Sequence, residues 1–384
     1  MADEIELITS VQGLESAIDE MLAAPRYSLD VESDGFHSYA GRVCIVTLST
    51  EHRDVVIDTL ALGRETSRLQ RLVASAHKPC LMHSGHNDVL ALKREYEMPF
   101  GFVQDTSVAS MLLGFTHTGL SALCETFLGF TLEKELQRHD WARRPMLPEH
   151  VSYLVNDTRH LFKLHDLITA ELAKHGLSDE YEIECRAVAE SEPIEREFDP
   201  ERFRKIKGAL DINDEGRGIL RALYMWRNET AKSLDRAAFR VASDSTLLEI
   251  ARTRPTGLDD LSRLRGVGEW LLNQAGDAIL SAVSHGQKNP APLRGPHRPR
   301  HDDTGTRMDP RQRDRLGRLK KWREQEAQKR GLGLQAILPT SVLHDLVLQP
   351  PADAAALAAV PRVGPSRAQR YGDQILRIVR GRQQ

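Results

Sequence analysis

The sequence predicts an α/β domain at the N-terminus, followed by two copies of a small all-helical domain. Three short runs of β-forming residues come first, at 27–31, 43–48 and 55–58, separated by polar or glycine-containing turns. Strand and helix patterns then alternate to about residue 105, which is typical of an α/β sheet. Beyond residue 210 the helical pattern repeats after 96 residues without a gap. The length of 384 residues also favours more than one domain.

The first domain spans residues 1–205. We expect its early elements in this order: strands at 27–31, 43–48 and 55–58, a helix near 65–76, a strand at 79–82, a helix near 87–95 and a strand at 103–105. The remainder to about residue 175 is mostly helical, with one long helix from about Pro148 to Lys174. Residues 176–210 read as a charged connector rich in Glu and Arg.

The helical copies span 210–287 and 309–384, with a flexible linker at 288–308. Apolar residues three or four apart predict helices in each copy, and the Pro, Gly, His and Arg content predicts the linker. The aligned pairs include Leu220 with Leu316, Leu223 with Leu319, Trp226 with Trp322, Arg227 with Arg323 and Ala231 with Ala327.

Composition indicates a folded protein without a membrane partner. Hydrophobic residues make up 40% and charged residues 28%, and no apolar run approaches the length of about 18 residues that spans a bilayer. The acidic N-terminus is unlike a signal peptide, so we expect a cytoplasmic location. The cysteines lack the short spacings of a zinc site, and buried thiols are expected; they are Cys44, Cys80, Cys124 and Cys185.

Charge is distributed unevenly along the chain. Residues 291–384 carry 19 Lys and Arg against 9 Asp and Glu, whereas the whole chain has 52 and 55. This leaves 33 against 46 in residues 1–290. The basic part suggests a polyanion partner, and the acidic part contains candidates for metal binding; solvated surface charge is the alternative for both.

Two carboxylates lie at the end of the first predicted strand. Alternation along a strand places Asp30 and Glu32 on the same face. They repel each other unless a cation lies between them, and a divalent ion with oxygen ligands fits that place. The alternative is a pair of solvated loop acids.

Two further segments carry acidic residues. In the long predicted helix, a spacing of four places Tyr153 and Asp157 on one face, where the carboxylate could bind a metal and the phenol could reach a metal-bound water. The alternative is an ordinary amphipathic helix. Asp88 lies in the first turn of another predicted helix, either as an acid favoured by the helix dipole or as an outer-sphere metal ligand. His83 and His86 lack the additional His or Cys that zinc would require.

Taken in order, these motifs resemble the DEDD exonuclease superfamily in its tyrosine-bearing branch, and specifically ribonuclease D. Each helical copy, with Leu-x-x-Trp-Arg followed by Ala and then Val-Gly, resembles the HRDC domain. Further residues that match ribonuclease D are Asp105, Thr106, Ala109, Leu112, Leu120, Leu123, Phe127–Gly129, Leu132, Lys134, Gln137, Asp140, Trp141, Arg144 and Pro145. The chain departs from many relatives at Thr47–Ser49, where they have a Gln, and the second copy has Gln325 where the first has Glu229.

The resemblance implies a ribonuclease H-like mixed sheet and a 3′-5′ exoribonuclease. It implies that Asp30, Glu32 and Asp157 bind one Mg²⁺ or Mn²⁺, that Asp30 bridges to a second ion, that Asp88 acts mainly through water, and that Tyr153 orients the attacking water. The implied products are nucleoside 5′-monophosphates, and the implied substrates are RNAs with a 3′ end, including transfer-RNA precursors. No oligomer is implied.

Three other functions remain open from the residues. The dipeptides His139-Asp140 and His165-Asp166 suggest an HD phosphohydrolase, which would need an all-helical core. A DNA exonuclease would share the same carboxylates, and an RNA-binding scaffold without catalysis would share the same fold. Helicase activity is not expected, because the phosphate-binding motif Gly-x-x-x-x-Gly-Lys-Ser/Thr is missing from the sequence.

Overall fold

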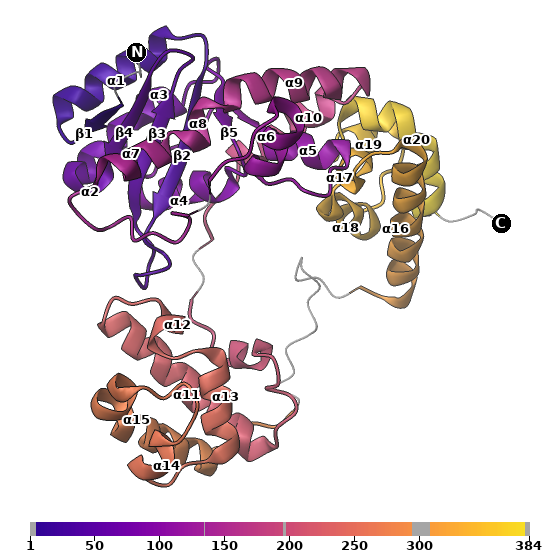
Figure 1. The fold of residues 1–384 in the computed structure, drawn as a ribbon. Coiled ribbons are helices and arrows are strands. Elements are labelled where there is room, and N and C mark those ends of the chain that lie inside the picture. The colour runs from indigo at the N-terminus through magenta and orange to yellow at the C-terminus, as the bar shows by residue number, and fades with distance from the viewer. Residues whose placement is uncertain (1–4, 134, 195–196, 294–307, 381–384) are drawn as a thin grey trace. The chain divides into compact units, whose positions relative to one another are not determined.

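The computed structural model describes residues 5–133, 135–194, 197–293 and 308–380. Two compact units divide the chain. One comprises Met1–Glu32, Val43–Pro193 and His301–Gln384, and the other Ser33–Arg42 and Ile194–Arg300. The first unit therefore holds most of the α/β domain together with the second helical copy, and the second unit holds the first copy (Figure 1).

A six-stranded mixed sheet forms the centre of the first unit, in the order β1-β4-β3-β2-β5-β6. The pairs β1–β4, β2–β5 and β5–β6 are parallel, and β3–β4 is antiparallel. The strands are β1 (Glu6–Ile8), β2 (Tyr27–Ser33), β3 (Val43–Ser49), β4 (Asp54–Asp58), β5 (Cys80–Met82) and β6 (Val103–Asp105). The predicted α/β class is confirmed, and the all-helical core of an HD phosphohydrolase is contradicted.

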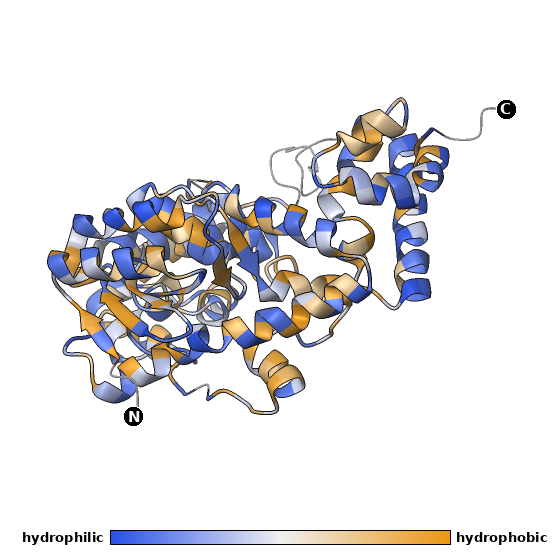
Figure 2. Ribbon diagram, turned by 90° about the horizontal axis from the view of Figure 1, so that it is seen from above, coloured by the Kyte–Doolittle hydropathy of each residue, from blue (hydrophilic) through white to orange (hydrophobic). Residues whose placement is uncertain are grey.

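Helices cover the sheet because their apolar residues recur on one face. In α1, Leu14, Ile18 and Met21 are buried in the same cluster as Val46 of β3. Figure 2 shows hydrophobic and hydrophilic residues alternating along the helices. The helices around the sheet are α1 (Val11–Ala23), α2 (Thr59–Leu62), η1 (Gly63–Leu69), α3 (Gln70–Val73) and α4 (His86–Tyr96).

A layer of helices follows β6 and differs from the sequence expectation in two places. The long helix predicted from Pro148 to Lys174 is three helices, because the chain turns after Leu154 and again near His160. The predicted connector at 176–210 contains a full helix, α10. The helices are α5 (Thr106–Leu113), α6 (Leu120–Leu128), α7 (Pro148–Leu154), α8 (Asn156–Arg159), α9 (Leu161–Lys174) and α10 (Ser178–Ala189).

The second unit is the first helical copy with the segment Ser33–Arg42. Within it, the Tyr39 hydroxyl donates to Asn228 Oδ1 at 2.9 Å, and the rings of Phe36 and Phe239 meet edge to face. This segment lies inside the sequence-predicted first domain, yet it groups with the helices that follow. They are η2 (Pro200–Lys205), α11 (Asp214–Ser233), α12 (Ala238–Val241), α13 (Asp244–Thr253), α14 (Leu258–Ser262) and α15 (Glu269–Lys288).

The second helical copy repeats a contact of the first at an offset of 96 residues. Arg227 donates to the carbonyl of Ala242 at 2.9 Å, and Arg323 donates to the carbonyl of Leu338 at 2.9 Å. The duplication seen in the sequence is therefore a structural one. The helices of this copy are α16 (Pro310–Arg330), α17 (Leu334–Ile337), α18 (Thr340–Leu348), α19 (Ala354–Ala358) and α20 (Gly364–Arg380).

The second copy is packed against the helices of the α/β domain. Leu332 and Ala336 are buried in the cluster that contains residues of α5 and α9. The Gly333 N–H donates to the carbonyl of Leu112 at 2.9 Å, and Arg370 of α20 pairs with Glu180 of α10 at 2.8 Å. This copy is thus a docked part of the first unit.

The predicted linker and the predicted cytoplasmic location are only partly addressed by the described residues. Most of the predicted linker at 288–308 falls outside the described residues. Within the described ranges, every helix falls short of the length and apolarity needed to cross a membrane. The cytoplasmic location stays a prediction.

Candidate active site

Strand β2 presents two carboxylates where it leaves the core. Its first three residues are buried and its next three are partly buried, so Asp30 and Glu32 sit at the transition between the apolar interior and solvent. Tyr27 and Leu29 anchor the strand in the core. Because alternate residues share a face, the two carboxylates point to the same side of the sheet.

Helix α8 brings Asp157 to the same side. The next residue, Thr158, is fully buried and is fixed to two strands: its carbonyl accepts from Ser28 Oγ at 3.1 Å, and its hydroxyl lies 2.7 Å from Ser49 Oγ. Arg159 pairs with Asp54 of β4, with Nε at 3.1 Å from Oδ2. A helix of four residues is held against the sheet by these side-chain contacts rather than by its own stability.

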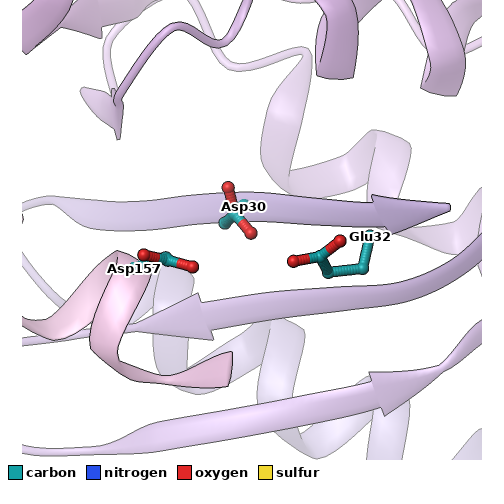
Figure 3. Close-up of side chains that lie close together, drawn as sticks. All are labelled: Asp30, Glu32 and Asp157. Atoms are coloured by element: carbon teal, nitrogen blue, oxygen red, sulfur yellow. The ribbon is translucent and has the colours of Figure 1, made fainter. Parts of the chain in front are cut away.

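Asp30, Glu32 and Asp157 form one cluster. One carboxylate oxygen from each lies within 4.8 Å of those of the other two, and Figure 3 shows the three carboxylates turned toward one another. Loss of water, together with the charge of the neighbouring carboxylates, raises the pKa of Asp30 to about 7 and of Glu32 to about 9. Loss of water raises the pKa of Asp157 to about 6. Such uncompensated negative charge suits a divalent cation with oxygen ligands.

Asp88 lies beside this cluster, in the first turn of α4. Burial raises the pKa of Asp88 well above the usual range, and the charges of Asp30 and Asp105 raise it further. The charge of Asp88 in turn raises the pKa of Glu32. Asp88 is therefore close enough to interact electrostatically, although it lies outside the group of three described above.

Tyr153 lies next to the cluster, near the end of α7. Its side chain is buried, and its pKa rises to about 12 because of burial and then the charges of Asp157, Glu32 and Asp30. The phenol is therefore protonated at neutral pH and able to donate a hydrogen bond. Although α7 ends at Leu154, Val155 keeps helical backbone angles, which preserves the predicted spacing between Tyr153 and Asp157.

Comparisons with known proteins match the chain to two families. Residues 5–173 match the 3′-5′ exonuclease family model, and residues 217–283 and 312–379 each match the HRDC domain. Ribonuclease D of Gluconacetobacter diazotrophicus is 28% identical over 280 residues, covering 72% of this chain and 71% of that protein. The chain is a ribonuclease D-type 3′-5′ exoribonuclease.

Solved structures support the fold of this exoribonuclease. The crystal structure of Escherichia coli RNase D matches with a TM-score of 0.63 at 19% identity, covering 98% of this chain and 99% of that one. A protein from Bifidobacterium adolescentis matches with a TM-score of 0.74 at 19% identity, covering 98% and 97%. The fold is therefore shared with these two structures over nearly the whole chain.

The candidate site of this exoribonuclease contains a residue whose contact the sequence patterns did not reveal. Trp141 is fully buried, and its ring stacks on that of Tyr153 with centroids 6.1 Å apart. Its carbonyl accepts from Arg144 at 2.7 Å, and Arg144 also pairs with Asp58 at the end of β4. Trp141 thus supports the ring of Tyr153. Its place in an irregular segment between α6 and α7 provides no periodicity from which this contact could be inferred.

The histidines of the alternative motifs lie outside the carboxylate cluster. The ring of His139 meets that of Trp141 edge to face and is tilted against that of His150. His165 lies 3.7 Å from Asp166, which also pairs with Arg26. His83 Nδ1 lies 2.9 Å from Thr106 Oγ1. Among the described residues, the metal-compatible group is the carboxylate cluster and includes none of these histidines.

Proposed function

We propose that this exoribonuclease removes nucleotides one at a time from RNA 3′ ends and releases nucleoside 5′-monophosphates. The proposal assigns the reaction to the carboxylate cluster, with two divalent ions as cofactors. The observation that supports it most directly is the convergence of Asp30, Glu32 and Asp157 within 4.8 Å, with Asp88 close by.

The donor set fits Mg²⁺ or Mn²⁺. Hard divalent ions prefer oxygen ligands, and the elevated pKa values of these carboxyl groups indicate that they lack a compensating cation of the protein. Asp30, Glu32 and Asp157 would hold one ion, and Asp30 and Asp88 would help to hold the second. The chemistry supplied by such bound ions is activation of a water and stabilisation of the leaving 3′-oxygen.

The protein's own groups would orient the water and receive its proton. Tyr153 keeps its phenolic proton at neutral pH and would hold the attacking water in position. Glu32 belongs to the same cluster and would help accept a proton from that water. Trp141 would keep the Tyr153 ring from turning away.

Structured RNAs are the substrates that we propose, with transfer-RNA precursors among them. Support comes from the ribonuclease D relatives and from the basic composition of residues 291–384, which suits a polyanion. Escherichia coli RNase D, which shares the fold, is described as an exoribonuclease involved in structured RNA processing.

A 5′-labelled RNA with an unstructured 3′ tail tests the proposal. With Mg²⁺ or Mn²⁺ we expect a ladder that shortens from the 3′ end, and nucleoside 5′-monophosphates as products. Asp157→Asn, purified in the same way, controls for contaminating nuclease. Internal cleavage, shortening from the 5′ end or full activity of Asp157→Asn would overturn it.

Substrate competition separates RNA from DNA as the preferred polymer. The two are mixed at equal concentration with matched sequence and different labels. Faster consumption of DNA would favour the DNA exonuclease that the carboxylates alone also allow. Binding without turnover at any metal concentration would instead favour the scaffold.

A further inference from the structure

A buried aspartate outside the carboxylate cluster ties two segments of the chain together. Asp105, at the end of β6, is 1% exposed. Its Oδ1 accepts from the N–H groups of Ser107 at 2.8 Å and Val108 at 3.3 Å, which caps helix α5. The same carboxylate also accepts from Ser84 N–H at 3.0 Å and from Gly85 N–H at 2.8 Å. Capping α5 does not require these last two bonds.

The turn that Asp105 holds has a restricted shape. Ser84 has a φ of 57°, a left-handed conformation that is unfavourable for a residue with a side chain. At Gly85, an added Cβ would come within 2.7 Å of the Met82 side chain. The bonds from Ser84 and Gly85 to Asp105 offset the cost of this conformation. The turn therefore depends on a side chain that lies 20 residues further along the chain.

This turn leads directly into the helix that carries Asp88. Helix α4 begins at His86, with Gly85 as its N-cap, and Gly85 has no side chain with which to cap the helix. Asp88 is the third residue of α4 and interacts with Asp30. Because a helix rises only 1.5 Å per residue, Asp88 lies within one helical turn of Gly85. A shift of the Ser84–Gly85 turn would therefore move the Asp88 carboxylate with it.

We propose that Asp105 is a positioning residue for catalysis, which fixes the Ser84–Gly85 turn and thereby the place of Asp88 beside the carboxylate cluster. This inference rests on the proposed role of Asp88 in metal binding. This role accounts for the two pairs of hydrogen bonds that the buried carboxylate accepts. One pair caps α5, and the other pair holds the Ser84–Gly85 turn.

Asp105→Ser separates the two roles. Serine is a favourable N-cap, so the variant keeps a cap for α5, but its shorter side chain cannot reach the turn. Val108→Ala is the matched control, because it removes packing from the same helix without touching the four bonds. Mn²⁺ binding is measured by electron paramagnetic resonance and by the rise in Tm on Mn²⁺ addition, alongside the single-turnover rate over a range of Mn²⁺ concentrations.

We expect Asp105→Ser to weaken Mn²⁺ binding by about tenfold, as loss of an outer-shell partner typically does, and its rate to recover partly at high Mn²⁺. Val108→Ala should lower Tm but keep the parent Mn²⁺ affinity. An unchanged Mn²⁺ affinity and rate in Asp105→Ser would reduce Asp105 to a helix cap. If Asp105→Ser does not fold, Asp105→Asn, which preserves size, takes its place with the same expected direction.

Asp88→Asn distinguishes failure of this inference from failure of the proposed site. If Asp88→Asn binds Mn²⁺ weakly while Asp105→Ser binds it normally, only the positioning role is wrong. If Asp88→Asn itself retains the parent affinity and rate, the assignment of Asp88 is wrong, and the role of Asp105 falls with it.

Discussion

At the scale of single residues, the cluster is a place where the fold concentrates negative charge that it does not neutralise. Asp58, by contrast, is a buried acid whose charge is paired with Arg144. The carboxylates of β2 and α8 face one another instead. Sequence patterns could propose these residues, because a spacing of two on a strand or four on a helix is local information, and the resemblance to ribonuclease D joined the separate spacings into one predicted site. Trp141 and Asp105 act through contacts with distant segments, so no local pattern reveals their roles.

Asp30→Asn should abolish activity while stabilising the metal-free protein. The change removes a proposed metal ligand, and the several kcal/mol that a bound metal supplies correspond to a loss of at least about 10²-fold in rate. It also removes repulsion from Asp157 and Glu32, so Tm in EDTA should rise. Single-turnover assays and thermal unfolding measure the two effects. A parent-like rate in the purified variant would remove Asp30 from the site.

The metal-free protein should become less stable as pH rises. The ordinary values of these acids are 3.8 for Asp and 4.5 for Glu, whereas the folded-state pKa is about 6 for Asp157, about 7 for Asp30 and about 9 for Glu32. Between about pH 4 and 9 the unfolded chain has lost these protons before the folded chain does, so the free energy of unfolding falls through that window.

Unfolding in EDTA at several pH values measures this dependence. Comparison with Asp30→Asn isolates the cluster, because other titrating groups are common to both proteins. Between pH 5 and 9, the Tm of the parent protein should fall further than the Tm of the variant. Parallel Tm profiles would show that the cluster does not carry the predicted charge.

Tyr153→Phe should slow the reaction by about 10²-fold and leave metal affinity nearly unchanged. The phenol would orient the water, and misplaced nucleophiles lose rate by about this factor. The phenyl ring should keep its stacking on Trp141, so the fold should be preserved. Single-turnover rates and Mn²⁺ binding are the measurements. An unchanged rate would leave Tyr153 with a packing role only.

At the scale of elements, the strands were predicted better than the short helices. Runs such as Val43–Ser49 are buried along their whole length, and their β-branched composition identifies them. Helix α8 has four residues and is stabilised by Thr158 and Arg159 binding to the sheet, which no periodicity encodes. Strand β1 and helix α1 were not predicted at all. At three residues, β1 is too short to show alternation, and its place depends on pairing with β4.

Gly333→Ala tests how the second HRDC domain is attached. An added Cβ would lie 1.8 Å from the carbonyl oxygen of Met111, so the backbones of α5 and the α17 N-terminus must separate. Overpacking typically costs about 1–3 kcal/mol. We expect a lower Tm and faster proteolysis of the second HRDC domain. Gly317→Ala, in open space on α16, is the control and should stabilise by about 1 kcal/mol. Equal behaviour of the two variants would contradict the close packing.

At the scale of the whole molecule, duplication is visible in the sequence, but the docking of the second copy is not. Both copies keep the Arg-to-carbonyl bond at Arg227 and Arg323. In the second copy, Leu332 and Ala336 are buried among residues of the exonuclease domain. Partner choice between domains depends on a few surface residues rather than on helical periodicity. Deleting residues 291–384 would therefore expose apolar surface, and neutralising surface charge is a cleaner test of RNA binding.

Replacing Arg313, Lys320 and Lys321 by Gln should weaken RNA binding more than it slows the chemical step. These residues are exposed on α16, away from the carboxylates in sequence, and the domain carries the basic excess of the chain. Each phosphate contact on a single strand contributes about 0.7 to the slope of log affinity against log salt, so loss of three contacts should reduce that slope by about 2.

The control replaces Arg64, Lys174 and Lys207 by Gln, which changes net charge equally at other exposed positions. Dissociation constants for one tailed RNA are measured at several salt concentrations, with Ca²⁺ in place of Mg²⁺ to suppress cleavage. An effect of net charge alone would weaken binding in both triple variants to a similar extent, because both lose three positive charges. A flatter slope in the α16 variant alone would place phosphate contacts on that helix. Unchanged affinity in the α16 variant would mean that its basic residues are solvated surface, and the exonuclease assignment would stand without them.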